Sequence, residues 1–218
     1  EQKVRRFVAD ASHELRTPLA AIRGYSELTR RSGHELPEDI RHALSRIESE
    51  SVRMSALVDD LLLLARLDEG RELRRDPVDL GRVLVDAVAD ARATSAAHEW
   101  VVRVPETPVV VEGDEHRLHQ VVANLLANAR IHTPEGTRVT AALGSLEGRA
   151  IVTVTDTGPG IPDDIKPVLF ERFARGSASA SDGGSGLGLY VSRELCRAMG
   201  GDLVLEPAAP GRSAALRA

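Results

Sequence analysis

The sequence predicts an α+β protein of two parts: an N-terminal helical hairpin that forms a dimeric four-helix bundle, and a C-terminal α/β two-layer sandwich. The first part follows from a heptad pattern of apolar residues over 40–65, which is typical of helices in bundles. The second follows from short β-branched runs that alternate with amphipathic stretches after residue 78. A length of 218 residues suits two small domains, placed at 1–70 and 80–218 with a linker over 71–79.

The composition argues against several classes of protein. A formal net charge of -5 and the lack of a long basic run argue against a nucleic-acid binder. Cys196 is the only cysteine, so neither an internal disulfide nor a cysteine zinc cluster can form. No apolar run approaches the roughly 18 residues of a membrane span. Because the chain starts inside a helical pattern, we expect a fragment whose upstream part is missing.

The hairpin begins with a helix expected from near residue 1 to about residue 31, followed by a turn that ends at Pro37. Two helices cannot bury wide apolar stripes against each other alone, so we expect two copies of the hairpin to form a four-helix bundle. The alternative is a hairpin packed on the rest of its own chain. Two seams line the second helix: Ile40, Ile47, Met54 and Leu61 form one, and Leu44, Ser51, Val58 and Ala65 form the other.

A histidine in the first helix lies close to a proline. His13 is followed directly by Glu14, and Thr17 lies one helical turn further along. Pro18 has no N–H for the carbonyl of Glu14, so the helix should kink and loosen there. An imidazole with a carboxylate and a hydroxyl in reach is arranged for chemistry at a ring nitrogen. Taken alone, however, a lone histidine on a helix is more often a solvated surface residue.

The second part alternates strands and helices, which indicates a two-layer α/β sandwich. The predicted helices cover 80–91, 115–131 and 187–199, and the predicted strands cover 100–104, 109–112, 138–143, 150–155, 203–205 and 214–216. The sequence lacks a G-x-x-x-x-G-K-S/T loop and a G-x-G-x-x-G after a first strand. Neither the P-loop nor the dinucleotide fold is therefore supported.

Three features of the second part point to a nucleotide site. Asn124 and Asn128 lie one turn apart on a helix whose apolar residues face inward, and amide oxygens suit Mg2+ that carries phosphates. Asp156 follows a buried strand, where its carboxylate can accept a hydrogen bond from an exocyclic amine. The glycines of 183–188 open the last helix, whose first N–H groups and dipole favour phosphate.

Each of these features also has a plainer interpretation. The two asparagines are equally consistent with capping or solvated side chains. Taken alone, the Asp156 motif fits a turn with a polar residue better than a ligand site. The segment 166–182 is small and polar, as a lid over a nucleotide would be, and it also fits a surface loop.

Taken together and in order, the motifs closely resemble those of bacterial sensor histidine kinases of two-component systems. The resemblance covers nearly the whole chain. Residues 7–20 resemble the phosphoacceptor box, 118–134 the asparagine box, 156–162 the first glycine box, 169–173 the phenylalanine box and 184–189 the second glycine box. For the second part it implies an ATP-binding fold of the gyrase, Hsp90 and histidine-kinase type.

The resemblance implies a role for each residue of the phosphoacceptor motif. His13 would take the γ-phosphoryl group of ATP, and Glu14 would orient its ring and accept its other proton. Thr17 matches the position that helps to place water when a partner regulator is dephosphorylated. The implied activity is ATP-dependent autophosphorylation of His13, followed by transfer to an aspartate of a response regulator. Phosphatase activity toward that regulator is left open.

The remaining motifs would hold ATP and Mg2+. The resemblance implies that Asn124 and Asn128 bind the metal, with Asn128 the surer ligand, and that Asp156 reads the adenine amino group. Phe170 and Phe173 would anchor the lid or belong to the core, and we favour the core. The other residues implied in nucleotide binding are His132, Gly158, Gly160, Arg175, Gly184, Gly186, Leu187 and Gly188.

The sequence departs from the family at Ile131, where a lysine is common. Two alternatives stay open. One is an ATPase of the same nucleotide-binding superfamily, against which the His13 motif counts. The other is a non-catalytic dimerisation scaffold with a degenerate pocket, for which Ile131 is the best argument. The expected partners are a second copy of the chain, ATP and the receiver domain of a response regulator, in the cytoplasmic portion of a membrane protein.

Overall fold

The computed structural model describes residues 15, 18–29, 37–68, 73–174, 186–206 and 214–217. The chain divides between Arg71 and Glu72 into two compact units. None of the described helices combines the length and the apolarity needed to cross a bilayer.

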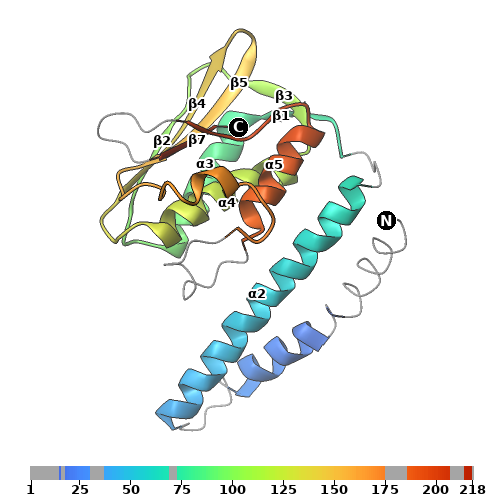
Figure 1. The fold of residues 1–218 in the computed structure, drawn as a ribbon, viewed down its shortest axis with the longest axis vertical. Helices are drawn as coiled ribbons and strands as arrows, with labels where there is room; N and C mark the ends of the chain where they lie inside the picture. Colours follow the sequence, from blue (N-terminus) through green and yellow to red (C-terminus); the bar gives the residue numbers. More distant parts are fainter. Residues whose placement is uncertain are drawn as a thin grey trace. The chain divides into compact units, whose positions relative to one another are not determined.

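The described residues of the first unit form two helices (Figure 1). The first is helical over 18–29, and α2 runs over Glu38–Asp68. The carbonyl of Pro37 accepts a hydrogen bond from the N–H of Arg41 at 3.0 Å, which starts α2 where the sequence predicts. Leu19 of the first helix forms a buried cluster with Val58 and Leu62 of α2.

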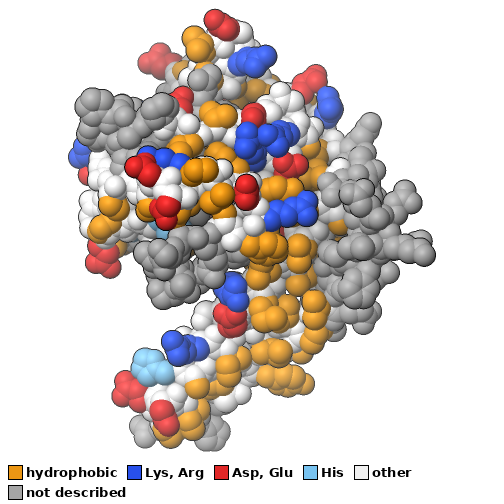
Figure 2. Space-filling view, in the orientation of Figure 1, with side chains coloured by type: hydrophobic (Ala, Val, Ile, Leu, Met, Phe, Trp, Pro, Cys, Tyr) orange, Lys and Arg blue, Asp and Glu red, His pale blue; other side chains and the backbone are white. Residues whose placement is uncertain are grey.

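The two heptad seams of α2 have different environments. Three residues of one seam are buried: Ser51, Val58 and Ala65. By contrast, Ile40, Ile47 and Met54 are 44%, 45% and 40% exposed, and we call these three residues the exposed seam. Large apolar residues of the first helix are exposed as well: Leu15, Ile22, Tyr25 and Leu28. Figure 2 shows apolar side chains gathered along the hairpin, so its described residues leave one of the two seams uncovered.

The second unit consists of two sheets and a layer of helices. A five-stranded sheet has the order β2-β4-β5-β7-β6, and β1 pairs with β3 in a separate two-stranded sheet. The strands are β1 Asp76–Asp79, β2 Glu99–Arg103, β3 Val110–Gly113, β4 Arg138–Leu146, β5 Arg149–Asp156, β6 Val204–Glu206 and β7 Ala214–Arg217. The helices are α3 Leu80–Thr94, α4 Glu115–His132 and α5 Gly188–Ala198, with a short 3-10 turn at Lys166–Val168.

The three helices lie side by side on one face of the five-stranded sheet (Figure 1). Helix α4 is central, because it packs against both α3 and α5 and against β4 and β5. The residues predicted to face inward from α4 are all buried: Val121, Val122, Leu125, Leu126 and Ala129. Leu195 of α5 and Leu84 of α3 are also fully buried. The core therefore fills the space between the helices and the sheet, as the two-layer prediction requires.

The predicted elements of the second unit are all present, with ends that differ by at most three residues. The β4–β5 hairpin pairs as predicted, with Leu143 opposite Val152. Its two turn residues, Glu147 and Gly148, have φ of 51° and 75°, as tight two-residue hairpins require. The segment expected as a linker ends in β1, which pairs antiparallel with β3.

Candidate nucleotide-binding site

Asp156 is the last residue of β5, and its side chain is held at the strand end. Its Oδ1 accepts a hydrogen bond from the backbone N–H of Gly158 at 2.9 Å. Gly158 has no room for a side chain, because a Cβ atom there would lie 2.6 Å from Cγ2 of Thr133. The turn after β5 therefore packs directly on the residue that follows α4, and only glycine permits this approach.

Thr133 caps the C-terminal end of α4 and was not singled out by the sequence motifs. Its hydroxyl donates to the carbonyl of Ala129 at 2.7 Å and lies 3.1 Å from Nε2 of His98. Because the hydroxyl proton goes to Ala129, the oxygen of Thr133 accepts from His98, which sets the proton of that imidazole on Nε2. The neighbouring His132, predicted to bind nucleotide, is exposed at the end of the helix.

Asn124 projects from α4 toward the start of α5. Its Nδ2 donates to Oγ of Ser192 at 3.1 Å and to the carbonyl of Gly188 at 3.4 Å. Asn128 lies one turn further along the same face of α4 and is half-buried. Thr133 follows Asn124 by nine residues. The Asp156 turn, which packs on Thr133, and the start of α5, which contacts Asn124, therefore meet α4 at points about 13 Å apart along its axis.

The N-terminal end of α5 differs from those of α3 and α4. Asp79 and Asp114 cap α3 and α4 by accepting hydrogen bonds from backbone N–H groups of the first turn. Leu187 occupies the same position before α5, and its buried side chain cannot accept a hydrogen bond. The first turn of α5 therefore relies on other groups to satisfy its N–H donors, and a phosphate is well suited to them.

Gly186 and Gly160 both have left-handed backbones, with φ of 70° and 85°. A Cβ atom on Gly186 would lie 2.9 Å from the backbone of Phe173. The chain before α5 thus touches the chain at the end of the phenylalanine motif. Glycine is required at position 186 because of its left-handed φ and because of this close approach.

Phe173 is 58% exposed and has φ of 62°, so the preference for a core position is wrong for this residue. The apolar side chain is turned outward because the backbone reverses there to meet Gly186. Phe170 is half-buried, and the guanidinium of Arg193 lies 4.9 Å from its ring centre. Cation–π contact with α5 therefore holds Phe170 in place.

In a second cation–π pair the positions are exchanged, so that the ring lies on α5 and the arginine lies in the phenylalanine motif. Arg172 lies 4.8 Å from the ring centre of Tyr190 on α5 and donates to its hydroxyl at 2.8 Å. Asp202 accepts from Arg193 at 2.9 Å, and this hydrogen bond holds the pKa of the Asp202 carboxyl below its usual range. Together these contacts tie the described start of the lid segment to the surface of α5.

Replacing Tyr190 with phenylalanine should remove the hydrogen bond to Arg172 while keeping the ring. We expect the free energy of unfolding to fall by about 0.5 kcal/mol, because the bond is exposed. Urea denaturation of Tyr190→Phe, Arg172→Met and the double variant would measure the coupling between the two side chains. Strictly additive losses would contradict the pairing.

Cys196 is buried on α5, and burial raises the pKa of its thiol to about 11. The thiol therefore stays protonated at neutral pH and is enclosed, which argues against a role as nucleophile.

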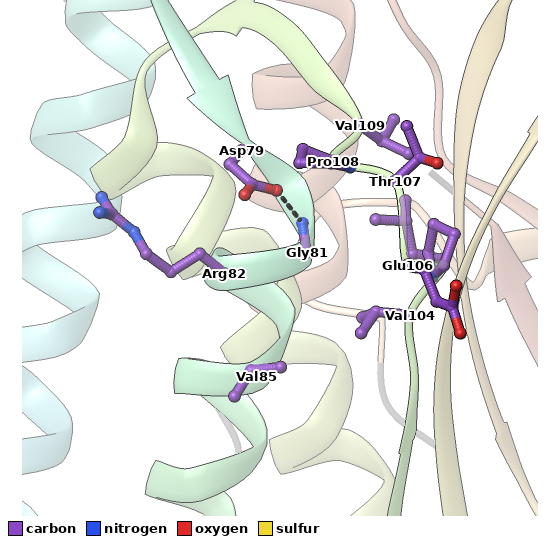
Figure 3. A pocket seen from close by; sticks show the side chains of 11 residues that line it. Asp79, Gly81, Arg82, Val85, Val104, Glu106, Thr107, Pro108 and Val109 are labelled. Carbon is purple, nitrogen blue, oxygen red and sulfur yellow. Dashed lines mark hydrogen bonds between the residues drawn. The ribbon is translucent and has the colours of Figure 1, made fainter.

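A separate hollow of about 360 Å³ lies at the start of α3 (Figure 3). Val85 of α3 and Val104 after β2 point into it, and Asp79 at its edge bonds to the N–H of Gly81. The full lining comprises Asp79, Gly81, Arg82, Val85, Val104, Pro105, Glu106, Thr107, Pro108, Val109 and Leu143. Among these residues there is none that the sequence motifs assign to nucleotide binding.

Several predicted site residues lie outside the described part of the chain: His13, Glu14, Thr17, Arg175 and Gly184. The structure brings Asn124 together with Gly188, and Asp156 together with Gly158. Thr133 and Ser192 were not predicted as site residues. A usable signal existed for Ser192, since it lies one helical turn beyond Gly188.

Two family models match the chain. The His Kinase A (phospho-acceptor) domain matches residues 3–70, and the model described as histidine kinase-, DNA gyrase B-, and HSP90-like ATPase matches residues 113–216. The probable sensor histidine kinase TcrY of Mycobacterium tuberculosis is 54% identical over 213 residues, which cover 97% of this chain and 44% of that protein. TrcS, a sensor histidine kinase of the same organism, is 48% identical over 94% of this chain and 41% of its own length. The chain thus spans less than half the length of these relatives.

Solved structures of similar proteins cover about two thirds of the chain or nearly all of it. The mycobacterial sensor histidine kinase MprB aligns with a TM-score of 0.57 at 35% identity, over 66% of this chain and 94% of that chain. Full-length ShkA in complex with AMPPNP aligns with a TM-score of 0.76 at 29% identity, over 98% of this chain and 45% of that chain.

Proposed function

Because the chain belongs to the sensor histidine kinases of two-component systems, we propose that it is the kinase core of such a protein. It binds ATP in the second unit, transfers the γ-phosphoryl group to His13, and passes it to an aspartate on the receiver domain of a response regulator. The observation that carries the proposal is the arrangement along α4. The Asp156 turn packs on one end of this helix, and the start of α5 contacts Asn124 further along it.

The described residues fit a nucleotide that spans this helix. The carboxylate of Asp156 accepts a hydrogen bond from the adenine amino group, and the bare backbone of Gly158 lets the base approach. The first turn of α5 faces the phosphates, where its positive dipole end favours negative charge. When bound, Mg2+ would offset the phosphate charge, and the amide oxygens of Asn124 and Asn128 form a suitable hard donor set for it.

Transfer to the histidine depends on positioning and on a neutral ring nitrogen. A histidine of ordinary pKa, about 6.5, is mostly neutral at the pH of a cytoplasm. Glu14 orients the His13 ring and accepts its other proton, so that the attacking nitrogen keeps its lone pair. Thr17 helps to place water if the same chain also dephosphorylates its regulator.

The exposed seam supports a homodimer. Ile40, Ile47 and Met54 recur at heptad spacing and are each at least 40% exposed in a single chain. A second copy that packs its own exposed seam against them completes a four-helix bundle with twofold symmetry.

The function is tested by incubating the chain with γ-labelled ATP and Mg2+, followed by acid and base washes. We expect label that is lost in acid, survives base and is absent from His13→Gln. The matched control is His42→Gln on α2, because this histidine is highly exposed and should not affect labelling. Rapid ATP hydrolysis without labelled protein would instead support the ATPase alternative. Absence of both labelling and ATP binding would support the scaffold, with Ile131→Lys as the variant to try.

A further inference from the structure

Ser192 is a fully buried serine in the middle of α5, at 0% exposure. Its neighbours in the core, Val191 and Leu195, are equally buried and wholly apolar. A hydroxyl in such surroundings requires a hydrogen-bond partner. That partner is Asn124 of α4, whose Nδ2 donates to Oγ at 3.1 Å.

The partners on α5 decide which end of the Asn124 amide faces away from this helix. The carbonyl of Gly188, one turn before Ser192, can only accept a hydrogen bond, so it must face the amide nitrogen. Ser192 supplies the second acceptor for the same nitrogen, at the shorter of the two distances. Because Nδ2 of Asn124 is hydrogen-bonded to α5, Oδ1 of the same amide lies on the side that faces away from this helix.

We propose that Ser192 is a positioning residue that holds the Asn124 amide with Oδ1 available to Mg2+ and withholds Nδ2 from it. The inference rests on the proposed function. It deepens that function because it gives a role at the Mg2+ site to a residue outside the glycine motif, which ends at residue 189. An amide nitrogen is a donor and repels a cation, so metal binding requires the orientation that Ser192 and Gly188 impose. Groups that orient a metal ligand commonly change metal affinity by about 10-fold or more when they are removed.

The test measures how much Mg2+ strengthens ATP binding, using titration calorimetry on the full chain in EDTA and at increasing Mg2+. For Ser192→Ala we expect the Mg2+-dependent gain in ATP affinity to fall about 10-fold. Affinity in EDTA should stay within about twofold, because without the metal the amide orientation no longer matters. Ser192→Cys keeps the size of the side chain but accepts hydrogen bonds poorly, so it should behave like Ser192→Ala.

A double-variant cycle separates positioning from packing. If Ser192 acts through Asn124, then Ser192→Ala should cause no further loss of Mg2+ dependence in an Asn124→Ala background. Val191→Ala is the matched control, since it perturbs an equally buried neighbour and should lower thermal stability without changing the Mg2+ dependence.

Independent losses from the two substitutions, or an unchanged Mg2+ dependence in Ser192→Ala and Ser192→Cys, would overturn the inference. Failure of the proposed ATP site looks different, because the unsubstituted chain would then bind no ATP in either condition. Failure of the kinase activity alone would leave ATP binding intact and the protein unlabelled.

Discussion

Asp156→Asn is expected to lower the affinity for ATP about 100-fold. Oδ1 of Asp156 accepts a hydrogen bond from the N–H of Gly158 at 2.9 Å. A backbone N–H can pair only with an acceptor, and in an asparagine side chain the acceptor is the amide oxygen. The new amide must therefore keep its oxygen on Gly158 and turn its NH₂ group toward the base. Two donors, the amide and the adenine amino group, would then face each other where a charged acceptor stood before. The loss includes both the missing hydrogen bond and an unpaired donor.

The same substitution should change the preference between nucleotides. Guanine presents a carbonyl acceptor where adenine presents its amino group, so the new NH₂ donor suits GTP better than ATP. We expect the ratio of ATP to GTP affinity, measured by calorimetry in the presence of Mg2+, to fall by at least 10-fold. The control is Asp163→Asn, which changes an exposed carboxylate that pairs with Lys166 at 2.5 Å. Equal losses for both nucleotides would show that Asp156 only supports the turn.

Gly158→Ala is expected to destabilise the second unit by about 1–3 kcal/mol and to weaken ATP binding by roughly 10-fold or more. The added Cβ would lie 2.6 Å from Cγ2 of Thr133 and 3.0 Å from Oδ1 of Asp156. Relief requires the turn after β5 to move away from the end of α4, which also displaces the Asp156 carboxylate. Both effects can be measured on one sample, by urea denaturation and by nucleotide titration.

The clash can be relieved from the opposite side. Thr133→Ser removes Cγ2 but keeps the hydroxyl that bonds to Ala129 and His98. Combined with Gly158→Ala, it should restore about half of the lost stability, because Cβ of residue 133 remains 3.0 Å away. Gly144→Ala is the control, since nothing lies within 4 Å of a Cβ there. The explanation fails if Gly158→Ala proves as harmless as Gly144→Ala.

The elements of the second unit could be predicted because their signals are local. Helix α4 repeats apolar residues at helical spacing, and all five residues predicted to face inward are buried. The β4–β5 hairpin alternates and encloses a short turn, so its pairing follows from neighbouring sequence. The prediction for Phe173 was wrong because its orientation depends on a non-local contact. Its apolar character suggested burial, but a left-handed backbone next to Gly186 turns the side chain outward.

The candidate site was predictable in its motifs and less so in its contacts. Asn124, Asp156 and Gly188 each stand in a recognisable local pattern, which is why all three were singled out. Thr133 and Ser192 stand in no such pattern, and they acquire their roles from partners on other elements. Ser192 meets Asn124 across 68 residues of chain, and the Arg172–Tyr190 pair likewise joins two separate segments.

The two-part architecture, the order of helices and strands, and the family of the chain can all be predicted from the amino-acid sequence alone, because periodicity and short motifs are properties of neighbouring residues. Three features could be known only from the packed structure: which seam of α2 is exposed, which end of the Asn124 amide faces α5, and why position 158 must be glycine. Each of these depends on distances between atoms far apart in the chain. Such distances arise only when the two helices of the hairpin pack together and the helices of the second unit pack on its sheet.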